Sequence, residues 1–208
     1  LLLVNKLDQT LETIMILYYA PGACSLADHI ALIEARLPYK LIGVNRDKRT
    51  EDGGDYLTIN PRGYVPALEL DDGTLLTENL AILAYIAHRS DTLLPEEGLT
   101  RWRALEAVSF MATEIHGGLR PFFKNLPALE KERARGTLTK HFASLAQQLG
   151  DNAFLLGDRM TIPDPYLFWA LKWAPAHGID VPERLQAYFS RMRKLPSVAQ
   201  ALVEEGLA

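Results

Sequence analysis

The chain of 208 residues contains a single cysteine, Cys24, shortly after the turn-forming pair Pro21-Gly22. After Cys24, apolar residues recur at spacings of three and four, namely Leu26, Ile30, Ile33 and Leu37. This periodicity predicts a helix that begins near Cys24. Free backbone N–H groups and the dipole at a helix start stabilise a thiolate, so this placement favours a reactive thiol. The alternative is a buried cysteine that packs as a small apolar residue. Ser25 either offers a hydroxyl to the same site or caps the helix.

A second set of polar residues stands at the start of a later helix. Glu78 and Asn79 precede an apolar helical stretch, so the free N–H groups there suit a ligand carboxylate, while Glu78 suits an ammonium. Together these groups match the head group of an α-amino acid. The alternative for Glu78 is that it only complements the helix dipole. The loop of residues 46–55 carries Lys48 and Arg49, which either meet an anionic ligand or are solvated.

His116 is a further candidate for proton chemistry. It follows a helical stripe from Trp102 to Ile115 and precedes Gly117-Gly118, where we expect the helix to end. If this helix packs beside Cys24, His116 can orient or polarise the thiol. Otherwise it bonds nearby carbonyls at the helix end. The spacing of His, Cys, Asp and Glu predicts no metal site.

The elements around Cys24 predict an α/β domain. Runs of β-prone residues at 15–19 and 39–44 flank its helix, which indicates a right-handed parallel β-α-β unit. The runs at 67–70 and 74–77 flank Asp71-Asp72-Gly73, which predicts an antiparallel hairpin. The four strands would form a mixed sheet. Pro66 stands at the start of the third strand, and a cis bond there would expose the Val65 backbone to a bound peptide.

The second half of the chain is helical in pattern. Residues 92–99 are expected to form a linker, and helices are predicted over 127–149, 163–174, 182–194 and 197–205. Thr161 and Asp164 have the spacing of a capping box before the helix at 163–174, which we expect to be buried and central. The expected domains are therefore an extension at residues 1–14, an α/β domain at 15–91 and an all-helical domain at 100–208.

Composition narrows the classes of function. Hydrophobic residues make up 48% and charged residues 23% of the chain, which is typical of a globular protein. The net charge of −4 gives no electrostatic basis for binding nucleic acid or an anionic membrane. Residues 1–14 lack the basic start and long apolar core of a signal peptide or membrane span. A single cysteine excludes an internal disulfide framework, so we expect a cytoplasmic protein.

The motifs taken in order resemble those of the cytosolic glutathione transferases, specifically the bacterial beta class. The matching stretches lie at 18–26, 60–68, 71–79, 112–116 and 161–168, and the resemblance covers residues 15–208. It implies a thioredoxin-like N-terminal domain, an all-α C-terminal domain and a homodimer that binds glutathione.

The resemblance also implies roles for residues of the α/β domain. Cys24 would hold glutathione as a mixed disulfide, and the Val65 backbone, before an expected cis proline, would pair with the cysteinyl unit of glutathione. Glu78 and Asn79 would take the γ-glutamyl head group. Arg49 falls where the class usually has a lysine near the glycyl carboxylate.

Residues of the helical domain would complete the site. The resemblance implies that Ser109, Thr113 and His116 line it, with His116 near the glutathione sulfur. The second substrate would sit between the domains, near Tyr18, His116 and Trp173. Gly117 departs from the family pattern, because close relatives often carry a lysine there.

The predicted enzyme binds reduced glutathione as co-substrate, with no cofactor, and stabilises its thiolate for attack on an electrophile. Cys24 and His116 are expected to contact the sulfur, with Ser25 as a reserve hydroxyl donor. A second hypothesis is thiol–disulfide exchange or peroxide reduction through an oxidised Cys24. The third is a non-catalytic relative that binds another protein, which the retained polar site residues disfavour.

Overall fold

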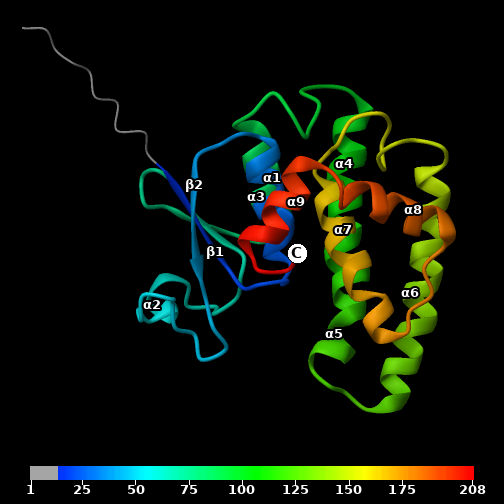
Figure 1. The fold of residues 1–208 in the computed structure, drawn as a ribbon, viewed down its shortest axis with the longest axis horizontal. Helices are drawn as coiled ribbons and strands as arrows, with labels where there is room; N and C mark the ends of the chain where they lie inside the picture. Colours follow the sequence, from blue (N-terminus) through cyan, green and yellow to red (C-terminus); the bar gives the residue numbers. More distant parts are fainter. Residues whose placement is uncertain (1–13) are drawn as a thin grey trace, which may run out of the picture.

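Residues 14–208, described by a computed structural model, form a sheet-containing part and a helical part (Figure 1). The first part contains β1 (Met15–Tyr19), α1 (Ser25–Glu34), β2 (Tyr39–Gly43), α2 (Tyr56–Ile59), β3 (Ala67–Glu69), β4 (Leu75–Thr77) and α3 (Asn79–His88). The strand order is β2-β1-β3-β4. β1 is parallel to β2 and antiparallel to β3, and β3 is antiparallel to β4, so the predicted mixed sheet is confirmed.

The helix behind the cysteine begins where the sequence predicts it. Cys24 is the N-cap of α1, and Leu26 and Ile30 are fully buried. The helix ends earlier than the apolar spacing predicts, because Arg36 adopts a φ of 54° and turns the chain toward β2. Leu37 therefore packs against the core from the connection rather than from the helix.

The segment between β2 and β3 contains a short helix, α2, that the sequence analysis missed. Its N-cap Asp55 accepts a hydrogen bond from the Leu57 N–H at 3.0 Å. Tyr56 is fully buried and donates its hydroxyl to the Tyr64 carbonyl at 2.6 Å, which fixes the chain before Pro66. The Val65–Pro66 bond is cis, as considered from the sequence.

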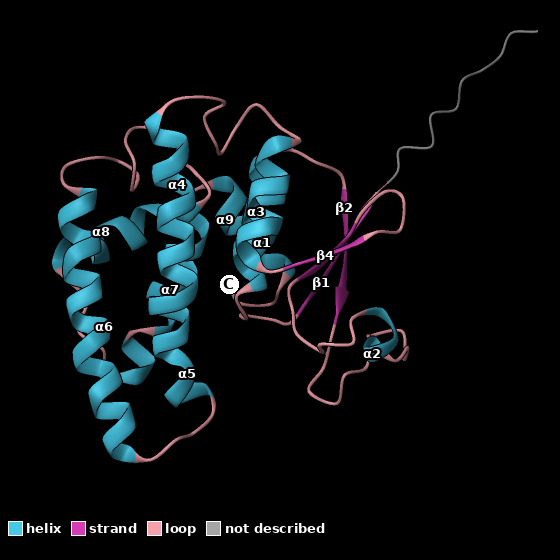
Figure 2. Cartoon of the chain, turned by 180° about the vertical axis from the view of Figure 1, so that it is seen from behind, coloured by secondary structure: helices cyan, strands magenta, loops and turns pink. Residues whose placement is uncertain are grey.

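The helical part begins at Leu99. It contains α4 (Leu99–Phe110), a π-helical turn η1 (Met111–His116), α5 (Gly117–Phe123), α6 (Ala128–Leu149), α7 (Pro163–Trp173), a 3₁₀ turn η2 (Pro175–His177), α8 (Glu183–Met192) and α9 (Pro196–Glu204). Figure 2 shows α6 and α8 on the side away from the sheet and α9 beside α1.

The predicted helix end at His116 is wrong. Gly117 keeps helical angles (φ −57°, ψ −41°), and the chain continues through it into α5. A Cβ on Gly118 would come within 2.8 Å of the Leu138 side chain of α6. The glycine therefore serves close helix packing rather than a helix stop.

The predicted central helix is confirmed, and the predicted capping box is present in part: the Thr161 hydroxyl donates to Asp164 Oδ2 at 3.0 Å rather than accepting the Asp164 N–H. The Asp164 carboxylate accepts hydrogen bonds from the Thr161 N–H at 2.8 Å and the Leu155 N–H at 2.9 Å. All residues of α7 from Pro163 to Leu171 are buried. One apolar core runs through both parts, and α1 packs against α3, α7 and α9.

Residues 92–98 of the expected linker at 92–99 lie between the end of α3 at His88 and α4, and Leu99 is already the first residue of α4. Of the expected N-terminal extension, residues 1–13 lie outside the described residues. Within residues 14–208, none of the helices combines the length and the apolar character needed to cross a bilayer.

Candidate active site

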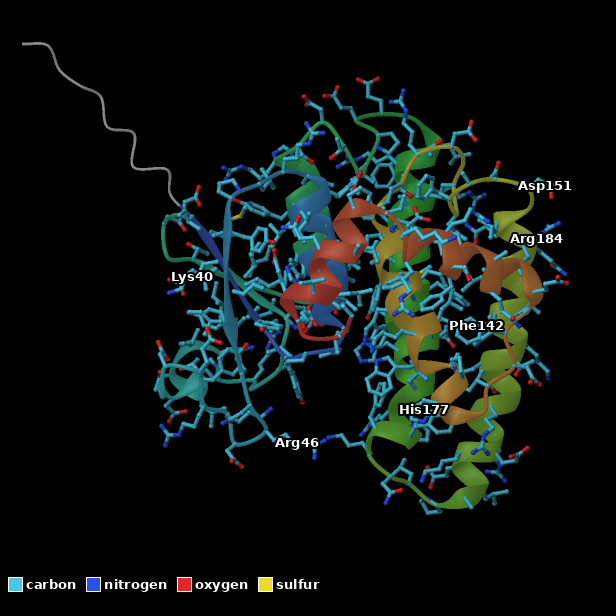
Figure 3. All side chains as sticks on the ribbon, viewed as in Figure 1. Lys40, Arg46, Phe142, Asp151, His177 and Arg184 are labelled. Atoms are coloured by element: carbon cyan, nitrogen blue, oxygen red, sulfur yellow. The ribbon has the colours of Figure 1, made fainter. Side chains whose placement is uncertain are left out.

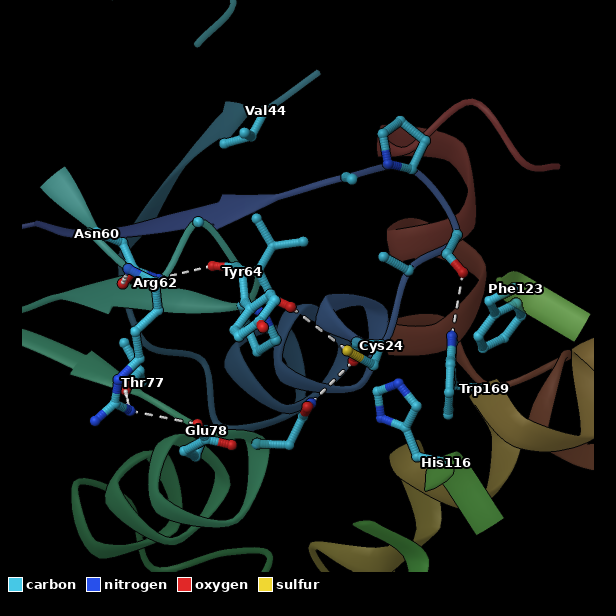
Figure 4. A pocket seen from close by; sticks show the side chains of 18 of the residues that line it. Cys24, Val44, Asn60, Arg62, Tyr64, Thr77, Glu78, His116, Phe123 and Trp169 are labelled. Atoms are coloured by element: carbon cyan, nitrogen blue, oxygen red, sulfur yellow. Dashed lines mark hydrogen bonds and ion pairs between the residues drawn. The ribbon is translucent and has the colours of Figure 1, made fainter. Parts of the chain in front are cut away.

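A cavity of about 610 Å³ lies where the sheet-containing part meets the helical part, and Figure 4 shows it from close by. One side consists of the loop before α1, the Val65–Pro66 segment and the start of α3. The other side consists of aromatic and small residues of the helical part: Ala112, His116, Phe123, Tyr166, Trp169 and Trp173. One side of the cavity is thus polar and built largely from backbone segments, and the other side is apolar.

Cys24 lines this cavity but is only 7% exposed. Its Sγ lies 3.6 Å from the Val65 carbonyl, the distance of an S–H donor. Burial and the nearby Asp28 carboxylate raise the pKa of the thiol to about 12, although N–H groups at the start of α1 oppose this. The expected thiolate is thus not the resting form of Cys24, because desolvation outweighs the helix start.

The start of α3 carries the second predicted group of residues. Glu78 has a φ of 74°, a conformation that costs a non-glycine residue about 1–3 kcal/mol and that surrounding contacts must hold. The Asn79 amide donates to the Cys24 carbonyl at 3.0 Å and to Asp28 Oδ2 at 2.9 Å. The structure thus brings Glu78 and Asn79 to the same cavity as Cys24.

The positive charges at the cavity differ from the predicted one. Arg49 is exposed and is not among the lining residues, whereas Arg46, Lys48 and Arg62 are. Arg46 extends from the loop after β2 toward the helical part (Figure 3). Lys48 donates to the Gly63 carbonyl at 2.7 Å, and Arg62 lies 3.5 Å from Glu78.

His116 faces Cys24 across the cavity (Figure 4) and bonds a tyrosine rather than a carbonyl. Its Nδ1 lies 2.8 Å from the Tyr166 hydroxyl, which has no other hydrogen-bond partner among residues 14–208. Burial keeps the pKa of Tyr166 far above its ordinary value, so the hydroxyl holds its proton, and His116 Nδ1 is its one hydrogen-bond partner among the described residues. We infer that the hydroxyl donates to Nδ1 and that Nε2 carries the imidazole proton. Burial also lowers the pKa of His116, which favours the neutral ring.

Two tryptophans of α7 hold the loop before Cys24. The Trp169 and Trp173 indole N–H groups both donate to the Gly22 carbonyl, at 3.1 and 3.0 Å. The Gly22 N–H donates to Glu205 Oε2 at 2.8 Å. The helical part thus fixes the peptide that leads to the thiol.

Several predicted residues lie away from the cavity. Ser25 is fully buried and bonds the Ala20 backbone, at 3.4 Å to its N–H and 3.5 Å to its carbonyl. Ser109 and Thr113 are exposed, and Thr113 bonds the Ser109 carbonyl at 3.3 Å. The expectation for Tyr18 is wrong, because it is buried in the sheet and donates its hydroxyl to Glu69 at 2.8 Å.

Sequence reasoning missed several residues of the cavity. Trp169 shares the apolar stripe of α7 with Leu167 and Phe168, so its sequence context indicates only a core position. Phe123 and Tyr64 carry no spacing that marks a site. For Lys48 a signal was present, since it belongs to the basic loop that the sequence analysis identified.

Comparison with known proteins agrees with this geometry. Residues 23–89 match the family model of the glutathione S-transferase N-terminal domain, and residues 110–196 match that of the C-terminal domain. The chain is 42% identical to the glutathione S-transferase GstA of Escherichia coli over 200 residues, covering 93% of this chain and all of that protein.

Two solved structures are similar over nearly the whole chain. A sphingomonad glutathione S-transferase complexed with glutathione is 40% identical, with a TM-score of 0.86 and coverage of 93% of this chain and 100% of that one. The beta class enzyme of Sphingomonas chungbukensis is 39% identical, with a TM-score of 0.87 and the same coverage. The chain therefore belongs to the glutathione S-transferase family and resembles its bacterial beta class.

Proposed function

We propose that this enzyme conjugates reduced glutathione to hydrophobic electrophiles in the cavity between its two parts. The observation that carries the proposal is the division of the cavity. A polar side with Cys24, the cis Val65–Pro66 bond and the α3 start faces an apolar aromatic side. Glutathione is the co-substrate, and the reaction needs no further cofactor.

The proposal assigns each part of glutathione to a group on the polar side. The Val65 backbone would pair with the cysteinyl unit, since the cis bond orients its N–H and C=O beside the cavity. The α3 start would bind the γ-glutamyl carboxylate, and Glu78 would bind the ammonium. Lys48 lines the cavity and Arg49 does not, so Lys48 is the better candidate for binding the glycyl carboxylate.

The sulfur of glutathione would then lie between Cys24 and His116. The Cys24 S–H and the His116 Nε2–H are both donors, and both would stabilise a thiolate on glutathione. That thiolate attacks the electrophilic carbon, and the leaving group departs with the bonding electron pair. Phe123, Trp169 and Trp173 would hold an apolar electrophile beside the sulfur.

Thiol–disulfide exchange through Cys24 is the second candidate, and a mixed disulfide with glutathione is part of it. The single observation in its favour is that Sγ lines the cavity. The raised pKa of the Cys24 thiol disfavours it near neutral pH, because exchange requires the thiolate.

We further propose that two copies of the chain form a homodimer in the cytoplasm. Leu99 and Trp102, on α4, are 68% and 64% exposed, which suits an apolar contact with a second copy. Light scattering of the protein at micromolar concentration would give twice the chain mass. A monomer would contradict the proposal.

The test of the main proposal combines turnover and binding. We expect conjugation of glutathione to an aromatic halide, and binding of glutathione by calorimetry. Lys48→Met should weaken glutathione binding about tenfold, the typical effect of one lost charge-assisted hydrogen bond. Arg49→Met, the matched control, should change it little.

The dipeptide γ-glutamylcysteine, which lacks the glycyl carboxylate, should bind both variants as it binds the parent enzyme. Loss of binding in Arg49→Met but not in Lys48→Met would restore the original assignment of Arg49. An absence of conjugation with retained glutathione binding would favour the exchange or the non-catalytic hypothesis.

A further inference from the structure

Asp28 is a buried acid that the proposed reaction does not use. It lies one helical turn after Cys24 on α1 and has no exposed surface. Its Oδ2 accepts the Asn79 amide at 2.9 Å, and its Oδ1 is buried without any hydrogen-bond partner among the described residues. A buried carboxylate with a free oxygen is costly, so burial raises the pKa of Asp28 above its ordinary value.

The same Asn79 amide connects Asp28 to the thiol residue. Its nitrogen donates to the Cys24 carbonyl at 3.0 Å as well as to Asp28. Both acceptors require the nitrogen on this side, which fixes the amide orientation. The amide therefore links Asp28 to the backbone of Cys24 beside the cavity that Cys24 and Asn79 line.

The charged groups facing Asp28 are all acids or neutral. On its own helix the neighbour is Cys24, and from the end of α9 it is Glu205, which raises the pKa of Asp28 further. The charge of Glu78, before α3, also raises the pKa of Cys24. Charges on Cys24 and Asp28 would in turn raise the pKa of Tyr166 on α7. The groups that shift the pKa of Asp28 or Cys24 include no lysine or arginine, so none of them offsets a negative charge. Two charges on Asp28 and Cys24 would thus repel in a medium of low dielectric.

We propose that Asp28 keeps Cys24 in its thiol form and thereby favours conjugation by glutathione over disulfide exchange at Cys24. The proposal rests on the proposed function and assigns Asp28 as a positioning residue of that site. A carboxyl loses its proton before a thiol in ordinary water. Burial raises the pKa of both groups, so this order is kept: as the pH rises, Asp28 loses its proton first, and its charge then opposes ionisation of Cys24.

The disfavoured reaction is attack of the Cys24 thiolate on oxidised glutathione. The Cys24 sulfur forms a bond to one glutathione sulfur, and the disulfide bond of oxidised glutathione breaks. One glutathione leaves as a thiolate and takes up the proton that Cys24 lost. Cys24 is thereby oxidised, and the released glutathione is reduced. A thiol that stays protonated does not start this sequence, but it can still donate to the glutathione thiolate.

The test uses Asp28→Asn, which removes the charge and keeps an oxygen to accept the Asn79 amide. The rate of alkylation by iodoacetamide is measured against pH, and every adduct is on Cys24 because the chain has no other cysteine. We expect the midpoint of the variant to lie at least one pH unit below that of the parent enzyme. Asp28→Ser should shift it in the same direction. Glu78→Gln is the matched control, and it should shift less because the Glu78 side chain is 72% exposed.

Adduct formation with oxidised glutathione at neutral pH is followed by intact mass. A midpoint lower by one unit gives about tenfold more thiolate and about threefold faster exchange, since nucleophilicity falls with the pKa. An unchanged or higher midpoint in both Asp28 variants would overturn the proposal. The alkylation test needs no glutathione, so it is independent of whether the proposed conjugation is found.

Discussion

His116 shows how one hydrogen bond sets what a side chain can do. With Tyr166 as the inferred donor to Nδ1, the imidazole offers an N–H rather than a lone pair to the cavity. In this state His116 can stabilise an anion on sulfur but cannot accept the proton of the glutathione thiol. In the proposed reaction the residue would act as an electrostatic group, and its tautomer depends on a tyrosine fifty residues away in sequence.

Tyr166→Phe should release this tautomer. We expect a stability loss of about 1–3 kcal/mol from the unpaired Nδ1 and a mixture of the two neutral forms of His116. Nitrogen NMR of ¹⁵N-histidine-labelled protein distinguishes the forms directly. Tyr188→Phe is the matched control, because its buried hydroxyl donates to Asp164 Oδ1 at 2.8 Å and not to a histidine. A single unchanged tautomer in Tyr166→Phe would contradict the assignment.

The lowered pKa of His116 makes folding stability depend on pH. The unfolded ring takes up a proton at a pH near 6.5, whereas the folded ring does so only at lower pH. Above this value both forms are neutral and His116 contributes no pH dependence. Below it the unfolded state binds more protons, so stability should fall as the pH falls from about 6.5.

Urea unfolding at a series of pH values measures this slope. His116→Asn should reduce the slope below pH 6.5, whereas the exposed control His88→Asn should leave it unchanged. An equal slope in the parent and in His116→Asn would show that burial does not perturb this ring.

At the scale of single residues, the sequence predicted which residues line the cavity better than it predicted the protonation state of each. Cys24, Val65, Glu78, Asn79 and His116 all line one cavity, as the motifs imply. The state of the Cys24 thiol was not predictable, because it depends on burial by distant elements. Lys48 lines the cavity in place of the predicted Arg49 because the Lys48 backbone, with a φ of 60°, turns the loop. No residue type at that position signals such a conformation.

Among the elements, the segment from α4 to α5 departs most from its sequence pattern. The strands, the hairpin and the start of α1 follow local periodicity and turn chemistry, which the sequence contains. The π-helical turn at Met111–His116 adds a residue per turn and shifts the face that His116 presents. In sequence, Gly117-Gly118 has the pattern of a helix end. The need for the second glycine is seen only in its contact with α6, which the sequence does not show.

These two glycines give opposite predictions. Gly117→Ala should stabilise the protein by about 1 kcal/mol, since the position is helical and the nearest atom to a new Cβ is 4.0 Å away. Gly118→Ala should destabilise it by about 1–3 kcal/mol, because its Cβ would meet Leu138 at 2.8 Å. Urea midpoints at constant slope measure both. Stabilisation by both substitutions would show that α5 and α6 can move apart.

On the scale of the whole molecule, the two parts are joined at the loop that carries the thiol. His29 of α1 is fully buried between Glu204 and Glu205, with Nε2 2.7 Å from Glu204 and Nδ1 3.1 Å from Glu205. The second carboxylate of this pair also accepts the Gly22 N–H. The end of α9 thus connects the buried histidine of α1 to the peptide that the two tryptophans hold from the other side. We expect the shape of the site to depend on this connection as well as on its own residues.

Glu205→Ala tests this connection. It leaves His29 with one carboxylate and the Gly22 N–H with none, so the free energy of unfolding should fall by about 3–5 kcal/mol. Hydrogen exchange should also speed up at the Gly22 amide. Glu205→Gln keeps an acceptor but removes the charge, and it should retain more of the Gly22 protection than Glu205→Ala does. Glu130→Ala, an exposed acid on α6, controls for the loss of a carboxylate.

Because the Gly22 loop leads directly into Cys24, faster exchange at Gly22 should be accompanied by faster alkylation of Cys24. Unchanged alkylation in a variant with lost Gly22 protection would mean that the thiol is shielded by the Val65–Pro66 segment and not by the joined domains.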